Sequence, residues 1–244
     1  MDRITVASTN GKDSVATFKG NVSTLYGLTL GNGTGTENIV IFDATGGAIT
    51  VAGTVDGTAG DTNMVIITGG ATTTVNDWNI GTVYVSETGT LNVDDNDLTA
   101  VVDGPGTLTS ASASGHTSLV IGVVGGNTAL NSITLSDAGT FLFASDVSAA
   151  TISTTAAGAL EFDGAVRGNV SLFTGSTAEL GIDNILTGDV EGAGTLTLLG
   201  GNTVSGAVGA TTALKNVNVS GVGLGDTTFG GAVSTADVNI SDPN

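Results

Sequence analysis

A short phrase returns along this chain: a Gly, a small residue, and then an apolar residue that is often followed by a second one two positions later. The first apolar residues of its copies, with that of a related phrase near residue 180, are Leu91, Leu108, Phe141, Leu160, Leu180 and Leu196. Successive members of this series are separated by one or two units of roughly 18 residues, and a period near 20 is typical of stacked repeat architectures.

Between and within these phrases, apolar and polar residues alternate over short stretches, as in Val83–Val85, Ile133–Leu135 and Val217–Val219. Such alternation predicts strands of about 3–6 residues with one buried and one wet face, bounded by Gly, Asn, Asp or Ser turns. The two Ala-containing runs, 148–157 and 206–213, are interrupted by Thr, Ser and Gly and do not predict a helix. The sequence therefore predicts an all-β chain.

Two β architectures compete for this pattern. Tandem β-sandwiches need a bulky core and turns spread over about 100 residues, whereas aromatic residues make up only 4% of this chain. We therefore expect a right-handed parallel β-helix, a β-solenoid with short strands, Gly/Asn/Thr-rich turns and about 18–20 residues per rung. Composition is nearly even from end to end, so residues 1–244 are predicted to form one continuous solenoid segment.

The chain is strongly acidic, with 23 acidic against 5 basic side chains and a formal net charge of −18. Such a surface repels phosphate backbones and anionic lipid headgroups, so nucleic-acid binding is not expected. The longest apolar stretch, Leu119–Val124, is too short to span a bilayer, so this segment is not expected to insert into a membrane. The absence of cysteine excludes disulfides and thiolate chemistry.

Two phrases resemble a known class of protein. Gly-Gly-Asn-Thr-Val-Ser-Gly-Ala-Val at 200–208 and Phe-Gly-Gly-Ala-Val at 229–233 are similar to passenger segments of bacterial autotransporters, above all of rickettsial outer-membrane protein B-like surface antigens. The resemblance is one of style and covers nearly the whole chain. It implies a non-enzymatic, extracellular segment of a bacterial cell-surface protein that coats the cell or carries adhesion.

That resemblance implies further expectations. The N-terminal residues contain no apolar signal segment, so we expect a fragment of a larger exported protein. Its expected partners are other copies of itself or a ligand on a host or neighbouring cell. An alternative is an S-layer or filament subunit that assembles through strand edges or through calcium.

An acidic stretch offers candidate calcium ligands. Asp94, Asp95, Asp97 and Asp103 place four carboxylates close together in the sequence, and Ca²⁺ prefers such hard oxygen ligands. Neither an EF-hand loop nor the Gly-rich repeats of calcium β-rolls is present. The alternative is a solvated acidic loop that binds no metal.

An enzymatic alternative uses the rung spacing. Asp77, the pair Asp94–Asp95 and His116 lie about one rung apart, in an order similar to that of pectin-degrading β-helical hydrolases, whose paired carboxylates act as acid and base. Those enzymes also use a basic Arg-x-Lys element, but Arg167 has no Lys beside it. We therefore expect no enzyme and no catalytic residue.

Two smaller pairs carry open alternatives. Glu161 and Asp163 flank Phe162 and so point to the same side of one strand, either as a carboxylate pair or as part of an exposed face. Trp78 and Tyr84 could form a platform for a glycan or could pack in the core.

Overall fold

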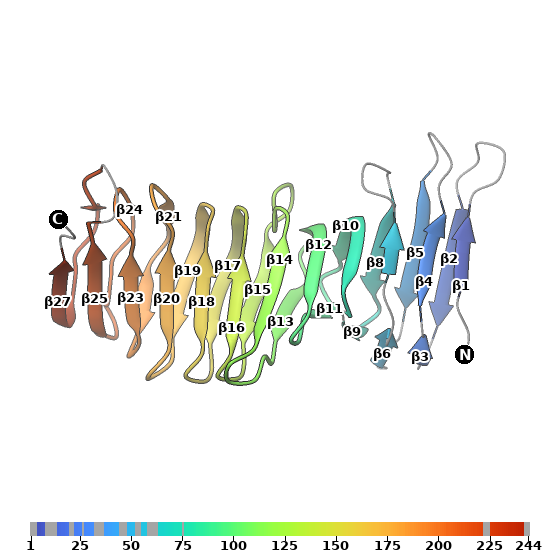
Figure 1. The fold of residues 1–244 in the computed structure, drawn as a ribbon, viewed down its shortest axis with the longest axis horizontal. Helices are drawn as coiled ribbons and strands as arrows, with labels where there is room; N and C mark the ends of the chain where they lie inside the picture. The colour runs from blue at the N-terminus through green and yellow to red at the C-terminus, as the bar shows by residue number, and fades with distance from the viewer. Residues whose placement is uncertain are drawn as a thin grey trace.

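A computed structural model describes residues 4–7, 14–19, 22–25, 27–31, 37–43, 48–51, 55–57, 63–74, 76–221 and 225–241. These residues form strands, turns and loops without a helix, and every strand pairing between them is parallel. The strands wind into a right-handed parallel β-helix of about ten turns, which Figure 1 shows from the side with its long axis horizontal. The predicted fold class is therefore confirmed.

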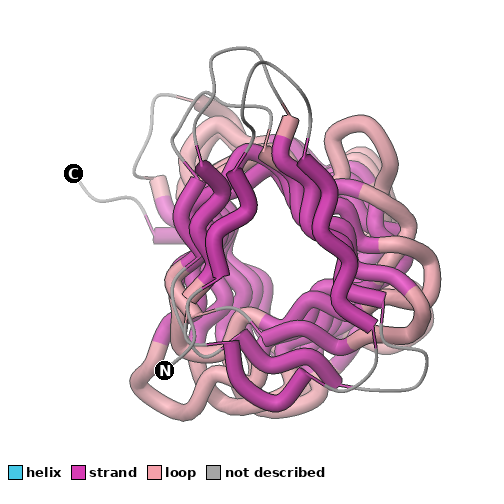
Figure 2. Tube along the Cα trace, turned by 90° about the vertical axis from the view of Figure 1, so that its right-hand side faces the viewer, coloured by secondary structure: helices cyan, strands magenta, loops and turns pink. Residues whose placement is uncertain are grey.

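Seen down its axis the solenoid is roughly triangular, and we call its sides the first, second and third faces (Figure 2). The first face contains β1 (Ile4–Ala7), β4 (Leu28–Gly31), β7 (Val55–Gly57), β14 (Thr117–Ile121), β16 (Thr140–Phe143), β18 (Ala159–Phe162), β20 (Thr177–Leu180), β23 (Thr195–Leu198), β25 (Leu214–Ser220) and β27 (Thr235–Ser241). The second face contains β2 (Ser14–Lys19), β5 (Asn38–Asp43), β8 (Met64–Thr68), β21 (Ile185–Thr187), β24 (Thr203–Val204) and β26 (Thr228–Phe229). The third face contains β3 (Val22–Leu25), β6 (Ala48–Val51), β9 (Thr72–Thr74), β11 (Thr90–Asn92), β13 (Thr107–Ser110), β15 (Leu130–Leu135) and β22 (Val190–Gly192).

Four longer strands bend around a corner and belong to two faces each. β10 (Trp78–Val85) pairs with β7 through its first residues and with β8 through its last ones. β12 (Asp97–Asp103) pairs with β10 on both sides of the bend and so turns the same corner. β17 (Val147–Thr154) and β19 (Val166–Leu172) likewise begin on the second face and end on the third. Because of these bends the three faces are hydrogen-bonded into sheets of 15 and 12 strands.

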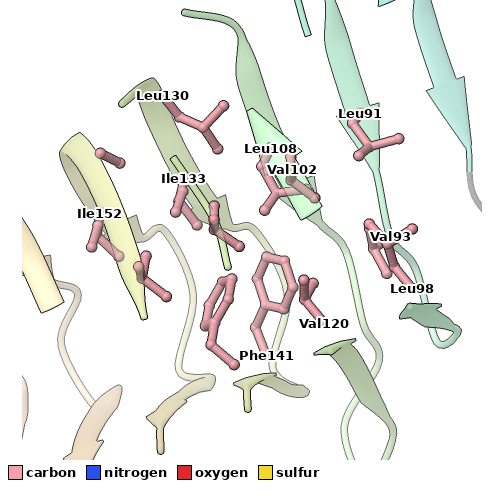
Figure 3. Packing of buried hydrophobic residues seen from close by; sticks show 14 of the residues in the cluster. Leu91, Val93, Leu98, Val102, Leu108, Val120, Leu130, Ile133, Phe141 and Ile152 are labelled. Atoms are coloured by element: carbon pink, nitrogen blue, oxygen red, sulfur yellow. The ribbon is translucent and has the colours of Figure 1, made fainter. Parts of the chain in front are cut away.

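The interior is built from columns of inward-facing apolar residues that oppose one another between rungs. On the third face Leu91 opposes Leu108, which opposes Ile133, which opposes Ile152 (Figure 3). All four side chains are fully buried. Leu91 and Leu108, which are neighbours in the series of the recurring phrase, therefore stack on adjacent rungs.

The recurring phrase, however, lies on two different faces. Phe141, Leu160 and Leu196 belong to a column of the first face, in which Ala178 fills the place between the two leucines. Leu180 lies two positions further along its strand, opposite Phe162 and Leu198. The long interval between Leu108 and Phe141 is therefore a change of face, not two rungs of one column.

Rung length varies more than the sequence predicts. Phe141, Leu160, Ala178 and Leu196 follow one another on successive rungs at nearly constant intervals, close to the expected period of roughly 18 residues. The rung from Leu108 to Ile133 is longer because the loops 111–116 and 122–129 add residues at the corners. The ladder closes in register in both cases, so the extra residues are absorbed outside the strands.

The second face has a valine column that the recurring phrase does not reveal. Successive rungs place one fully or almost fully buried valine at the same position: Val65, Val83, Val102, Val124, Val147 and Val166. A β-branched side chain has few rotamers to lose on a pleated surface and packs well against its neighbours there. This column belongs to the same core cluster as the buried apolar residues of the other two faces.

Glycines stack at one corner, where the backbones of neighbouring rungs come very close. A Cβ atom on Gly188 would lie 2.2 Å from the carbonyl oxygen of Gly168, and one on Gly206 would lie 2.1 Å from that of Gly188. Gly168 and Gly188 also have φ angles of +142° and +140°. Only glycine meets both conditions, which explains part of the high glycine content.

Candidate functional site

The acidic residues singled out in the sequence gather mainly at the corner between the third and first faces, just before β10, β12 and β14. Asp77 and Asp95 turn the chain there with φ angles of 51° and 53°, in the left-handed region that Asp tolerates better than most residues. The Asp77 Oδ1 atom accepts a hydrogen bond of 3.3 Å from the backbone N–H of Asp97, one rung later. The corner thus brings carboxylates of neighbouring rungs together.

Two of these carboxylates cap the turn of the next rung. Asp94 Oδ1 accepts a hydrogen bond from the Ala111 N–H at 2.5 Å. Asp95 Oδ1 accepts hydrogen bonds from the Ser112 hydroxyl at 2.5 Å and from the Ala113 N–H at 3.3 Å. Both side chains therefore satisfy donors that the ladder of strands leaves unpaired.

Behind this turn lies a buried cluster of hydroxyl groups that the sequence reasoning missed. The Ser118 hydroxyl lies 2.9 Å from that of Ser110 and 3.0 Å from that of Ser112, and it accepts a hydrogen bond from the Asp95 N–H. All three serines are fully buried. The available signal was that Ser110 and Ser118 occupy inward positions of their strands, where apolar residues are expected.

The four predicted calcium ligands do not share one place. Asp103 lies at the end of β12, on the second face, where it is 7% exposed and accepts a hydrogen bond of 2.7 Å from the Thr128 N–H. Asp94 and Asp95 cap backbone donors, as described above, and Asp97 is exposed. Among the residues that the structure describes, no three or more His, Asp or Glu side chains form a group that could hold a metal ion. Calcium binding stays a prediction, and this geometry does not favour it.

The residues of the hydrolase hypothesis lie at one corner, but in a different combination from the expected one. His116 Nδ1 lies 3.7 Å from Asp95 Oδ2, with the two side chains 61% and 38% exposed. Asp77 and Asp97 instead line an open depression of about 230 Å³ with Asn79 and Thr99. Such a depression can offer carboxylate and amide groups to a hydroxyl-bearing ligand.

The basic residue of that hypothesis is elsewhere. Arg167 lies on β19, where it lines a separate hollow of about 200 Å³ with Asp146 and Val123. The guanidinium group is therefore not placed to hold an acidic sugar at the corner that carries Asp77 and His116. The arrangement supports capping and binding more than acid–base catalysis.

A second group of carboxylates lies on the outer surface of the first face. Glu161 and Glu179 oppose each other on neighbouring strands, and Asp163 follows one strand end. Partial burial, followed by repulsion from Glu179 and Asp163, raises the pKa of Glu161 above its ordinary value. The sequence left Glu161 and Asp163 open as a carboxylate pair or as part of an exposed face, and it did not reveal Glu179, because the contact of Glu161 with Glu179 depends on the register between rungs.

The predicted alternatives for the aromatic pair can now be separated. Trp78 is 1% exposed, and its ring centroid lies 6.4 Å from that of Phe42. Core packing is therefore confirmed for Trp78, and a glycan platform built on it is wrong. Tyr84 is partly buried on the outer side of β10.

Comparison with known protein families, curated proteins and solved structures finds no match. Within the described part of the chain, no helix has the length and hydropathy needed to cross a membrane. The fold and the surfaces described above are therefore what a functional proposal can draw on.

Proposed function

We propose that this chain is a non-enzymatic structural or adhesive segment of a bacterial cell-surface protein, displayed outside the cell as a rigid rod. The observation that carries the proposal is the continuous ladder of parallel strands from β1 to β27, which persists through register shifts at the β3–β6, β10–β12 and β17–β19 pairings. About ten turns at ~4.8 Å each give a body roughly 50 Å long.

The different functions of the core and surface residues support this role. The interior is filled by apolar columns, and the acidic corner uses Asp94 and Asp95 to hold its own turns. Repeat architectures of this kind more often present extended surfaces than enclose a reaction centre. The net charge of −18 makes such rods repel one another and so opposes non-specific aggregation.

Surface display can be tested with an antibody raised against the purified chain. Intact cells of the bacterium that encodes the protein should bind the antibody, and external protease should remove the signal. An antibody against a cytoplasmic protein is the control and should bind only permeabilised cells. Binding of the chain-specific antibody to permeabilised cells alone would overturn the proposal.

Adhesion and coating are separated by a second experiment. Beads that carry the purified chain should attach to host or neighbouring cells if the role is adhesive, and free chain should compete. Beads that carry the heat-denatured chain are the control. Equal attachment of both bead types would argue against an adhesive face and in favour of a coat.

Assembly through calcium is the alternative structural role, and the acidic corner is its only specific support among the described residues. Light scattering should give the same mass in millimolar calcium and in EDTA if the carboxylates act as caps. A mass that rises with calcium, and that does not rise in an Asp77→Asn, Asp97→Asn variant, would favour a lattice or filament subunit.

A further inference from the structure

The third face carries a regular array of hydroxyl groups on its outer surface. On the six consecutive strands β9, β11, β13, β15, β17 and β19, both outward positions are Ser, Thr or Asn. The strand segments are Thr-Thr-Thr at 72–74, Thr-Leu-Asn at 90–92, Thr-Leu-Thr at 107–109, Ser-Ile-Thr at 132–134, Thr-Ile-Ser at 151–153 and Asn-Val-Ser at 169–171. The middle residue of each points into the core and the outer two remain accessible.

Strand pairing gives this array its spacing. Thr90 opposes Thr107, which opposes Ser132, which opposes Thr151, and the second column runs in the same register. Neighbouring members of a column are therefore about 4.8 Å apart. In tetrahedrally bonded water, two hydrogen-bonded steps of about 2.8 Å place second neighbours about 4.5 Å apart. The column spacing is thus close to a spacing of ordered water.

Hydrogen bonds along the columns hold the side chains in place. The hydroxyl oxygens of Thr107 and Ser132 are 3.2 Å apart, and those of Thr134 and Ser153 are 3.3 Å apart. The Thr109 hydroxyl donates to Asn92 Oδ1 at 2.8 Å. A hydroxyl that makes one such bond keeps further capacity for water. Binding to these six residues then costs little side-chain entropy, because hydrogen bonds already restrain their side chains.

The chemistry of the array limits the classes of ligand that it can bind. These outward positions carry no charge, although the chain as a whole has a net charge of −18 and the outer side of the first face carries Glu161 and Glu179. An ionic ligand would find no counter-charge there. The array also has no aromatic side chain on which a sugar ring could stack. The threonine side chains also carry methyl groups, and apolar groups restrict the orientation of the water next to them.

From this combination we infer that the third face binds ice. The hydroxyl and amide groups would hold water molecules at lattice positions, the methyl groups would order the water between them, and the rigid ladder would keep the array flat while a crystal surface forms on it. The ligand is therefore an extended lattice of water, and the face acts as a whole.

The test compares two double variants that differ only in the face they alter. Thr109→Tyr with Thr134→Tyr places two large side chains in the middle of the array, on register partners of the third face. Thr177→Tyr with Thr195→Tyr does the same on register partners of the first face, with similar exposure. Circular dichroism and a thermal unfolding curve establish that both variants fold like the parent chain.

Growth of a single ice crystal is then observed in a cooling-stage osmometer at equal protein concentrations. The parent chain and the first-face variant should shape the crystal and lower the temperature at which it grows, and the third-face variant should lose both effects. The inference would be overturned if the parent chain, like a control protein such as albumin, neither shaped the crystal nor lowered its growth temperature. Equal losses of both effects in the two variants would also overturn it.

A third measurement addresses the other periodic solid that a hydroxyl-rich face could bind. Adsorption to crystalline cellulose or chitin without any effect on ice would overturn the inference and assign the face to polysaccharide. None of these outcomes bears on display at the cell surface, because each uses the purified chain alone.

Discussion

Asp95 shows how one side chain can look like part of a binding site and yet hold the fold together. Its carboxylate accepts hydrogen bonds from Ser112 and Ala113, and its backbone N–H donates to Ser118. All three partners lie about one rung later in the chain. Whether an aspartate at a corner caps the next rung or faces a ligand therefore depends on register, which composition and local spacing do not determine.

We expect Asp95→Ala to lower the free energy of unfolding by about 1–3 kcal/mol, because it removes the carboxylate that accepts hydrogen bonds from the buried Ser112 hydroxyl and from the Ala113 N–H. Asp97→Ala is the matched control, since Asp97 is exposed, and should change stability by less than about 0.5 kcal/mol. Urea unfolding followed by circular dichroism measures both. Similar stabilities for the two variants would contradict the capping role.

The raised pKa of Glu161 predicts that the stability of the fold depends on pH. Because its pKa is raised in the folded chain, the folded state favours the protonated carboxyl group. This contribution to stability is fully present below the ordinary Glu pKa of 4.5 and is lost as the pH rises through the raised value. Glu161→Gln should therefore be more stable than the parent chain at pH 7 and should lose that advantage in acid.

Thermal unfolding at a series of pH values tests this, with Glu87→Gln in the exposed turn after β10 as the control. The control should follow the parent chain at every pH. A constant difference between Glu161→Gln and the parent chain across the series would rule out titration of this carboxyl group as the cause.

At the scale of strands and corners, the alternation of apolar residues was enough to predict short strands and a stacked core. It was not enough to assign strands to faces. The phrase at 89–93 and the phrase at 139–143 look alike, yet the first lies on the third face and the second on the first face. Each rung contributes strands to all three faces, so similar phrases can occupy different faces, and only the pairing between rungs tells them apart.

The corner glycines predict a steep cost of adding a single methyl group. Gly188→Ala should lower the free energy of unfolding by at least about 1–3 kcal/mol. The residue has a φ of +140°, and the added Cβ atom would lie 2.2 Å from the Gly168 carbonyl oxygen. Gly115→Ala is the control, since Gly115 also has a positive φ but has nothing within 4 Å of the added atom. The two unfolding midpoints should differ clearly, and equal losses would remove close backbone approach as the explanation.

The valine column makes a second prediction at this scale. Val124→Thr keeps the shape of a fully buried side chain but adds a hydroxyl group, and should cost about 1–3 kcal/mol of unfolding free energy. Val123→Thr, at the neighbouring outward position with 38% exposure, should be nearly neutral. Chemical denaturation distinguishes them, and a neutral Val124→Thr would show that the second face tolerates polar groups in its column.

For the whole molecule, the balance between a continuous core and a strong net charge should be visible in its response to salt. Raising NaCl from about 10 mM to about 150 mM shortens the Debye length from ~30 Å to ~8 Å and weakens repulsion among the acidic side chains. We expect the melting temperature to rise by a few degrees, equivalent to about 1 kcal/mol. KCl at equal ionic strength should act alike, and a melting temperature that does not move would show that the charges are already well separated.

The variation in rung length has a consequence for how such a chain can change over generations. Leu108 and Ile133 are opposed across a longer stretch of chain than Leu91 and Leu108, yet the strands pair in the same way. Codons gained or lost at a corner therefore alter what protrudes from the rod while leaving its length and its packing intact. Variants of this chain can therefore differ in one exposed loop at a time, on a scaffold that does not need to adjust.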